Sequence, residues 1–475
     1  MRPVSRTEIR LLFIALVTAS ALVLGAGYAT DSAASTTAEI REQAELAADE
    51  RTQVVAPRDG ITVVSTDSNA WLGAKSDGPR AVAELVAFDP DGTVRYYNDS
   101  HTRYWDVDPS PLGRATVLYT AADHLNESEC RATTVCTRNV VERVNLTTGQ
   151  VTRLFSRVTP YKHSTRWHDA DRVDDEHVVV ADIYRDRVFE VNTTSGIVTW
   201  SWNAQNEFDL GSGGEFPRDW THINNVQMLE DGRIAVSVRN QDQVVFLDPE
   251  RGVDRNWTLG ADDDHDVLYE QHNPDYISAA DGGPAVLVAD SENDRVVEYQ
   301  RTGDGWTRTW TWQDARMQWP RDADRLPNGH TLVTDSNGDR VFEVNRSGAV
   351  VWSVDVAFPY EAERLGTGDE SAGGPSARAA NLTSRTVAGD GGTSVDDGTA
   401  TAAGPLDRAW VRVKSLVPGQ FVNGVLYTVP TWMGGREVAA LLALVVTSLV
   451  WAGAEWRWSG LDVELRLPFV VRRRR

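Results

Sequence analysis

The sequence predicts an all-β fold, a six-bladed β-propeller, with one apolar helix near each end of the chain. Two observations predict the propeller: a unit of about fifty residues recurs along the chain, and each copy holds short β-branched runs separated by turn signals. A third observation predicts the helices, because an uninterrupted apolar run lies near each terminus.

The repeat is clearest in four consecutive copies, which align from the start of the first strand expected in each. These copies begin at His168, His222, His272 and Arg321. Turn dipeptides such as Asn328-Gly329 separate the runs, as four antiparallel strands require. Weaker copies over 61–97 and 104–155 bring the number of units to six. A closed ring would protect the sheet edges and leave a central channel. An open stack of β repeats is the alternative, although no capping unit is visible.

The rest of the chain divides by composition. We expect a signal peptide or transmembrane anchor at 1–29, a short stalk at 30–55, the propeller at 56–360, a disordered linker rich in Gly, Ser, Thr and Asp at 361–408, a juxtamembrane segment at 409–436, a transmembrane helix at 437–454 and a basic cytoplasmic tail at 455–475.

The two apolar runs indicate how the chain meets a membrane. The run from Leu11 to Tyr28 follows three arginines and fits either a cleaved signal peptide or an uncleaved anchor. The run from Val438 to Gly453 fits a short transmembrane helix, with a buried core helix as the alternative. Four arginines at 472–475 predict a cytoplasmic C-terminus by the positive-inside rule, and the arginines before Leu11 predict the same for an uncleaved N-terminus. The propeller would then face the exterior.

Charge excludes one class of function and supports this location. The formal net charge is −22 over 475 residues, and between Thr30 and Gly435 it reaches −27, so we exclude nucleic-acid binding. Arginine outnumbers lysine strongly, and this acidic, lysine-poor composition is typical of halophilic proteins. The two cysteines, Cys130 and Cys136, lie close enough in one loop to form a local disulfide in an oxidising compartment. Sequons that predict a glycoprotein occur at Asn98, Asn126, Asn145, Asn192, Asn256, Asn345 and Asn381.

Comparison of the repeats singles out two columns. The residues that open the innermost strands are Trp105, His168, His222, His272 and Arg321, and a propeller would bring these equivalent positions together around one mouth of the channel. The column after the second strand holds Asp182, Asp290 and Asp335, and we align Arg239 with it in the remaining copy. An arginine in place of an acid indicates a site for an oxyanion, which a guanidinium binds with two parallel hydrogen bonds.

Three imidazoles beside guanidinium groups suit the transfer of an anionic group. An imidazole acts as nucleophile or proton carrier near neutral pH, and the cations stabilise the negative charge on the group that is being transferred. A zinc ion held by three histidines is the alternative, but Arg239 would oppose a divalent metal. We therefore expect an anion site and no cofactor.

These residues resemble the arylsulfate sulfotransferase family of six-bladed propeller enzymes. The likeness is strongest over Asp219–Asp248, which holds a His-Asn pair with a downstream Ser-x-Arg, and over Tyr269–Asn273, which holds a Gln-His motif. The His168-Asp169 pair is similar to the sequence around a third histidine of this family. The resemblance covers roughly residues 60–357.

The resemblance implies a nucleotide-independent transfer of a sulfuryl group from an aryl sulfate ester to a phenolic or other hydroxyl acceptor. It implies that His272 becomes sulfurylated, that His222 and Arg239 hold the sulfuryl oxygens, and that His168 assists with charge or proton transfer. A covalent intermediate implies ping-pong kinetics. We also expect substrate contacts from Arg321, Trp105, Asn273 and Asn224.

The expected partners are a small aryl sulfate donor and a phenolic or glycan acceptor, at a membrane-anchored protein. Two other functions stay open at this point. One is a non-catalytic exterior propeller that binds a surface glycan or a partner protein. The other is a zinc- or quinone-dependent propeller enzyme.

Overall fold

The computed structural model describes the chain at residues 5–68, 81–110, 115–131, 135–368, 370, 372–386, 393–396, 399–402, 414, 416–464 and 470–473. Parts of the expected linker (369, 371, 387–392, 397–398 and 403–408), of the juxtamembrane segment (409–413 and 415) and of the basic tail (465–469 and 474–475) lie outside the described residues. The chain divides into two compact units, Ser32–Thr431 and a second unit of Met1–Asp31 with Trp432–Arg475.

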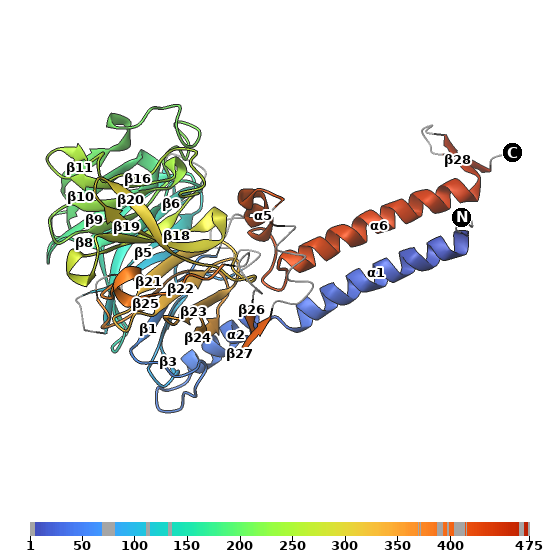
Figure 1. The fold of residues 1–475 in the computed structure, drawn as a ribbon, viewed down its shortest axis with the longest axis horizontal. Coiled ribbons are helices and arrows are strands. Elements are labelled where there is room, and N and C mark those ends of the chain that lie inside the picture. The colour runs from blue at the N-terminus through green and yellow to red at the C-terminus, as the bar shows by residue number, and fades with distance from the viewer. Residues whose placement is uncertain are drawn as a thin grey trace. The chain divides into compact units, whose positions relative to one another are not determined.

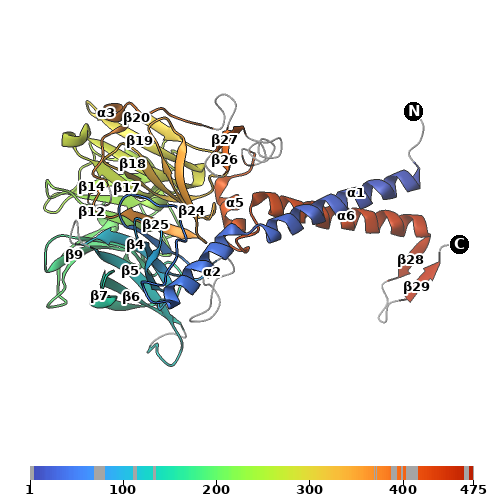
Figure 2. The same cartoon turned by 90° about the horizontal axis from the view of Figure 1, so that it is seen from below.

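The first unit confirms the predicted six-bladed β-propeller (Figures 1 and 2). Each blade is an antiparallel sheet, and the innermost strands of neighbouring blades contact one another around the ring. In order from the innermost strand, blade 1 contains β25 (Pro359–Arg364), β1 (Thr62–Thr66), β2 (Leu85–Phe88) and β3 (Val94–Asn98); blade 2 contains β4 (Arg103–Pro109), β5 (Thr116–Leu125), β6 (Cys136–Asn145) and β7 (Gln150–Pro160); blade 3 contains β8 (Trp167–Arg172), β9 (His177–Asp182), β10 (Arg187–Asn192) and β11 (Val198–Asn203).

The other three blades follow in the same order. Blade 4 contains β12 (Ile223–Met228), β13 (Ile234–Val238) and β14 (Gln243–Asp248) with the short outer strands β15 (Gly252–Val253) and β16 (Leu259–Gly260); blade 5 contains β17 (His272–Ile277), β18 (Ala285–Asp290), β19 (Arg295–Thr302) and β20 (Gly305–Trp312); blade 6 contains β21 (Pro320–Arg325), β22 (Thr331–Asp335), β23 (Arg340–Val344) and β24 (Val350–Asp355).

Blade 1 closes the ring with strands from both ends of the propeller segment. β25 pairs antiparallel with β1, with Arg364 opposite Thr62. The expected domain boundary at residue 360 therefore falls inside β25, and the structure corrects it to include the whole strand. The sequence comparison missed this strand because only one strand of the blade follows the fourth clear copy.

The propeller core lies between the blades. Apolar residues at alternating strand positions pack against the next sheet, as in the cluster that joins Val179, Val236 and Trp220. Trp202, Trp310, Trp312 and Trp352 from the ends of the repeats are buried, whereas Trp200 from the same set is half-buried. Tryptophan at the repeat ends therefore serves mainly blade packing.

Two segments outside the blades pack on the propeller. In α2 (Ser32–Glu45), within the expected stalk, Ile40 is fully buried among residues of blades 1 and 6. The first part of the expected linker contains α3 (Ala377–Ala380), whose first backbone N–H donates to the Glu298 carboxylate at 2.8 Å. The described residues around α3 are therefore part of the propeller surface and not a linker. A short hairpin follows, β26 (Thr393–Asp396) with β27 (Thr399–Ala402).

The second unit contains two helices that are long and apolar enough to cross a membrane, α1 (Arg6–Ala29) and α6 (Gly435–Ser459). They lie side by side in both ribbon views, and the Phe13 and Trp451 rings stack with their centroids 5.9 Å apart (Figures 1 and 2). Arg10 and Glu455 form an ion pair at 2.5 Å. A short hairpin, β28 (Leu461–Glu464) with β29 (Val470–Arg473), follows α6.

Candidate active site

One hydrogen bond, repeated from blade to blade, defines which residues are equivalent around the channel. An acid on each innermost strand accepts a backbone N–H from the next blade: Asp106 from Ala170 at 3.1 Å, Asp169 from Val226 at 2.9 Å and Asp322 from Ala362 at 3.1 Å. The position just before this acid forms what we call the first ring, which consists of Trp105, His168, Asn224, His272, Arg321 and Tyr360.

The first ring corrects the sequence alignment in blade 4. The equivalent residue there is Asn224, and His222 lies two positions earlier, at the place that Glu270, Trp319 and Phe358 occupy with the same left-handed backbone in blades 5, 6 and 1. His222 has φ +46°, a left-handed conformation that is uncommon for a residue other than glycine. This backbone still places the imidazole beside the ring, with its centroid 5.2 Å from that of His168.

The arginine column also needs correction. Short 3₁₀ turns follow the second strands of blades 3, 4 and 5, namely η1 (Ile183–Arg185), η3 (Arg239–Gln241) and η5 (Ser291–Asn293). The residue before each turn is Asp182, Val238 or Asp290, so Val238 and not Arg239 occupies the acid column. Arg239 is instead equivalent to Ser291, and both side chains contact a site histidine.

His272 opens β17 and is fully buried. Its Nδ1 lies 3.1 Å from the Glu270 carbonyl oxygen and 2.8 Å from the Ser291 hydroxyl. A carbonyl oxygen only accepts hydrogen bonds, so we assign the ring proton to Nδ1. The lone pair is then on Nε2, which faces a guanidinium nitrogen of Arg321. His272 thus presents an unprotonated nitrogen toward a cation.

His222 is held in the same manner by a carboxylate. Its Nδ1 donates to Asp219 at 2.5 Å, and its Nε2 accepts from Arg239 at 3.3 Å. Arg239 also forms an ion pair with Glu270 at 3.1 Å. These contacts fix both the tautomer of His222 and the direction of Arg239.

His168 lies between two aromatic side chains of the first ring. Its ring stacks on Trp105 with centroids 4.9 Å apart, and its Nδ1 lies 3.2 Å from the Tyr360 hydroxyl. Its Nε2 is buried without a hydrogen-bond partner among the described residues. An unpaired buried nitrogen is costly, so a hydrogen-bonding group placed beside this atom would be stabilising.

Burial and neighbouring cations keep all three histidines neutral. Burial lowers the pKa of His272 well below its ordinary value, and the charge of Arg321 lowers it further. For His168, burial dominates again, followed by His222 and Arg166. Burial and Arg239 lower the pKa of His222 to about 4, although Asp219 opposes this shift. At neutral pH the site therefore offers unprotonated imidazoles among permanent cations.

The structure adds residues that the sequence comparison did not select. Tyr360 completes the first ring, and the Arg321 guanidinium lies 5.3 Å from its ring centroid. Arg166 precedes the first strand of blade 3 and lies 5.4 Å from the Trp105 ring centroid. Its Nε and Nη1 are buried without a hydrogen-bond partner within the described part of the chain. Tyr360 was detectable from the sequence, because Tyr360-Glu361-Ala362-Glu363 repeats the pattern of residues 321–324.

The two predicted asparagines have different surroundings. Asn224 donates its side-chain N–H to the Gln271 carbonyl oxygen at 2.9 Å. Asn273 follows His272 with φ +36°, and its side-chain oxygen is buried without a partner among the residues that the structure describes. Their roles in binding substrate stay predictions, as do those of Arg321 and Trp105.

A helix from beyond the linker covers the site. α5 (Gly419–Leu426) places Gln420 against Glu270, and Asn423 donates to Glu292 at 2.9 Å. Tyr427, just after the helix, accepts from Arg103 at 3.4 Å. Burial, followed by repulsion from Glu270, raises the pKa of Glu292 to about 7. The hydrogen bonds that Gln420 and Asn423 make from α5 therefore end on two neighbouring acids, Glu270 and Glu292.

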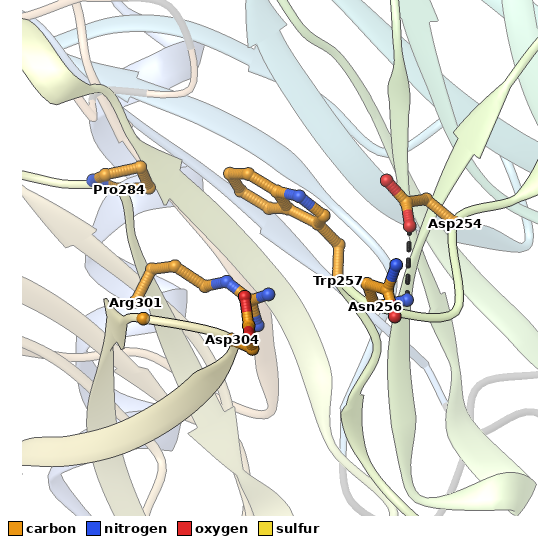
Figure 3. Close-up of a pocket in the computed structure, with 7 residues that line it drawn as sticks. Asp254, Asn256, Trp257, Pro284, Arg301 and Asp304 are labelled. Carbon is orange, nitrogen blue, oxygen red and sulfur yellow. Dashed lines mark hydrogen bonds between the residues drawn. The ribbon is translucent and has the colours of Figure 1, made fainter.

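Two other features lie apart from these residues. A disulfide joins Cys130, in the β5–β6 connection, to Cys136, the first residue of β6. A surface pocket of blades 4 and 5 is lined by Asp254, Asn256, Trp257, Pro284, Arg301, Gly303 and Asp304 (Figure 3). It contains no residue of the first ring.

The arrangement suits an oxyanion better than a three-histidine metal site. The Nδ1 atoms of His222 and His272 are engaged by their own supports, and guanidinium groups face both Nε2 atoms. A metal would have to displace two cations from those lone pairs.

Comparison with solved structures returns other proteins at low similarity. They include a protein of unknown function from Bacteroides caccae (11% identity, 64% of this chain and 98% of that chain, TM-score 0.42). They also include a periplasmic gluconolactonase from Pseudomonas aeruginosa (12%, 65% and 99%, TM-score 0.41) and virginiamycin B lyase from Staphylococcus aureus (6%, 62% and 88%, TM-score 0.37). These similarities carry no functional argument.

No curated protein matches the chain. The family comparison does give a match, and it spans the blades that supply His168, His222, His272 and Arg239. Residues 59–280 match the model of the arylsulfotransferase (ASST) family, which confirms the family resemblance seen in the sequence.

Proposed function

We propose that this protein is a nucleotide-independent aryl sulfotransferase that works by ping-pong transfer through a sulfohistidine at Nε2 of His272. The family match supports aryl sulfotransferase activity. The observation that carries the finer proposal is the state of His272: a neutral imidazole whose Nδ1–H is held by Glu270 and whose Nε2 lone pair faces Arg321.

In the first half-reaction, Nε2 of His272 attacks the sulfur of the aryl sulfate. The nitrogen–sulfur bond forms, the bond from sulfur to the aryl oxygen breaks, and a phenolate leaves. The transition state spreads negative charge over the sulfuryl oxygens, which Arg239 and Arg321 stabilise, while His222 positions Arg239 through its Nε2. Arg321 gives up its contact with Nε2 and binds a sulfuryl oxygen instead.

In the second half-reaction, an acceptor hydroxyl attacks the same sulfur and the nitrogen–sulfur bond breaks. The acceptor proton passes to Nε2 of His168, whose lowered pKa then releases it to solvent or to the departed phenolate. The net change exchanges one phenol for another hydroxyl, and His272 returns to its starting state. No cofactor is required by this balance.

The experiment measures release of a coloured phenol from an aryl sulfate by the full-length protein in detergent, with a panel of phenolic acceptors. His272→Gln is expected to lower turnover by about 10³-fold or more, because it removes the nucleophile. His177→Gln is the matched control, because His177 is a partly exposed histidine paired with Asp174 on blade 3. Mass spectrometry of donor-treated protein without acceptor is expected to find one sulfuryl group on His272. Turnover that survives in His272→Gln would overturn the proposal.

The proposed topology places the propeller at the exterior and both termini in the cytoplasm. The two apolar helices, the three N-terminal arginines Arg2, Arg6 and Arg10, and the Cys130–Cys136 disulfide support it. Ser195→Cys, at an exposed turn, is expected to react with a membrane-impermeant thiol reagent on intact cells. Labelling that appears only after lysis would reverse the topology.

A further inference from the structure

Below the first ring, the channel wall becomes acidic. The next equivalent positions form the second ring, which consists of Asp106, Asp169, Asn225, Asn273, Asp322 and Glu361. Two residues further along each strand lies the third ring, which consists of Asp108, Asp171, Gln227, Asp275, Asp324 and Glu363. All these side chains are buried. Glu370, beyond β25, is buried beside them.

Four of these acids accept a backbone hydrogen bond from the next blade, and Asp108 differs from them. Asp106, Asp169 and Asp322 accept backbone N–H groups from the next blade. Asp171 accepts from Met228 in the same way at 2.5 Å. Asp108 is equivalent to Asp171, yet both of its carboxylate oxygens lack a hydrogen-bond partner among the described residues, and the residue is only 3% exposed.

The unpaired oxygens of Asp108 point toward other carboxylates. Asp108, Asp106 and Glu361 bring one oxygen each within 4.8 Å of one another. Asp108 makes a second such group with Asp171 and Glu370, and Glu361 makes a third with Glu363 and Glu370. One oxygen of Glu361 also has no hydrogen-bond partner in the described part of the chain. The three groups share members and form one connected cluster.

Among the described residues, Arg325 and Arg364 interact electrostatically with the third-ring acids Asp275 and Asp324. Both also form ion pairs with acids outside the cluster, Glu298 at 3.1 Å and Glu343 at 3.6 Å. Buried carboxylates without compensation are unfavourable, so the cluster must take up cations or protons.

We propose that the acidic cluster below the first ring is a binding site for a hard divalent cation of the Ca²⁺ class, held by Asp106, Asp108 and Glu361 and completed by Asp171, Glu363 and Glu370. Calcium binds oxygen ligands at about 2.3–2.6 Å, so two ligands on opposite sides of the ion lie about 5 Å apart, which matches the separation within each group. All the ligands are oxygens, and no imidazole or thiol belongs to these groups, which disfavours zinc.

This cation would be structural. The ligands come from blades 1, 2 and 3 and from the segment after β25, so a bound ion would join the strand that closes the ring to its neighbours. It would also neutralise the acids that lie one step along each strand from the histidines. The proposal does not depend on sulfuryl transfer.

The test uses the full-length protein in detergent, treated with a chelator and transferred to metal-free buffer. Thermal unfolding is measured with CaCl₂, with MgCl₂ and with KCl at matched ionic strength, and bound metal is counted by elemental analysis. We expect retained calcium and a saturable rise in melting temperature with CaCl₂ that KCl does not reproduce. Stabilisation by MgCl₂ alone would assign the site to the smaller cation and overturn the calcium class.

Two variants separate binding from folding. Asp108→Asn removes one charge from the cluster, and we expect it to weaken Ca²⁺ binding by about tenfold or more, because affinity follows the charge of the ligand set. Glu370→Gln tests the same site from outside the blades, so that a folding defect of one variant leaves the other informative. Asp175→Asn, at a 99% exposed side chain, is the control.

Terbium luminescence sensitised by tryptophan reports occupancy directly, since Trp105 adjoins Asp106 in sequence. We expect a signal that Ca²⁺ displaces and that Asp108→Asn and Glu370→Gln weaken. Protein that holds no stoichiometric metal, ignores the chelator and becomes more stable on Asp108→Asn would overturn the proposal, because the carboxyl groups would then be neutralised by protons.

Discussion

The first ring and the second ring of the channel differ although they occupy adjacent positions on the same six strands. The second ring is nearly uniform, with acids and amides, three of which accept a backbone N–H from the next blade. The first ring varies from blade to blade through Trp, His, Asn, His, Arg and Tyr. The uniform residues of the second ring hold neighbouring blades together. The first-ring residues do not make this contact, so they can differ from blade to blade and provide the groups that a reaction needs.

Apart from loss of the nucleophile His272, the largest effect is expected at Arg239, where blade 4 differs from the serines of blades 5 and 6. Arg239→Ser gives blade 4 the residue that Ser291 and Ser336 supply in blades 5 and 6, so the turn itself should be preserved. Loss of a charged donor from the transition state is expected to lower kcat for an aryl sulfate by about 10²–10³-fold. Steady-state kinetics and thermal unfolding measure the two effects separately.

Arg233→Ser is the control, because Arg233 pairs with Asp231 and lies over Trp257, away from the first ring. An Arg239→Ser protein that keeps wild-type kcat would remove Arg239 from the site. A protein that loses activity and melting temperature together would show that the arginine serves the fold instead.

Much of the fold was predictable because the copies of a repeated sequence can be aligned with one another. Four copies with the same β-branched runs predicted the blades, and the same comparison selected His168, His272 and Arg321. The closing strand β25 was missed because blade 1 is built from two separate parts of the sequence, so no continuous segment of it aligns with the other copies. Tyr360-Glu361-Ala362-Glu363 nevertheless has the same residue pattern as the innermost strand of blade 6.

The errors at the site have local causes. The sequence comparison aligned His222 with the first ring although it lies two positions before it, where Glu270 lies before His272, and a one-residue shift placed Arg239 against the acids. Arg166 gave no repeat signal because it lies before the strand. The contact of Gln420 with Glu270 joins residues 150 positions apart, and no local pattern encodes such a pair.

The second prediction tests Arg166, the guanidinium that the repeat did not indicate. Its Nε and Nη1 are unpaired within the described residues, and burial with repulsion from Arg103 lowers its pKa to about 10. Such a group is expected to bind an anionic substrate, so Arg166→Gln should raise KM for the sulfate donor by about tenfold with a smaller change in kcat. Arg172→Gln, partly exposed and paired with Asp175, is the control. An unchanged KM would exclude Arg166 from donor binding.

The third prediction concerns pH. A histidine with the ordinary pKa of about 6.5 would be almost fully protonated at pH 5, with only about 3% of the nucleophile remaining. The pKa of His272 is well below that range and the pKa of His222 is about 4, so both rings stay neutral there. We expect kcat/KM to change little from pH 8 to pH 5 and to fall as the pH approaches 4. An acid limb centred near pH 6.5 would contradict the neutral, cation-flanked site.

The smallest effect is expected at the helix that covers the first ring. Asn423 is buried and donates to Glu292, while Gln318 donates to its side-chain oxygen. Asn423→Ala removes these two hydrogen bonds and leaves the histidines and arginines of the site unchanged. Because a loosened α5 would widen access to the first ring, we expect a few-fold rise in kcat/KM for bulky aryl sulfates and little change for the smallest one. Thr428→Ala, in an exposed turn after α5, is the control. Equal effects on small and bulky donors would show that α5 supports the site and does not limit entry to it.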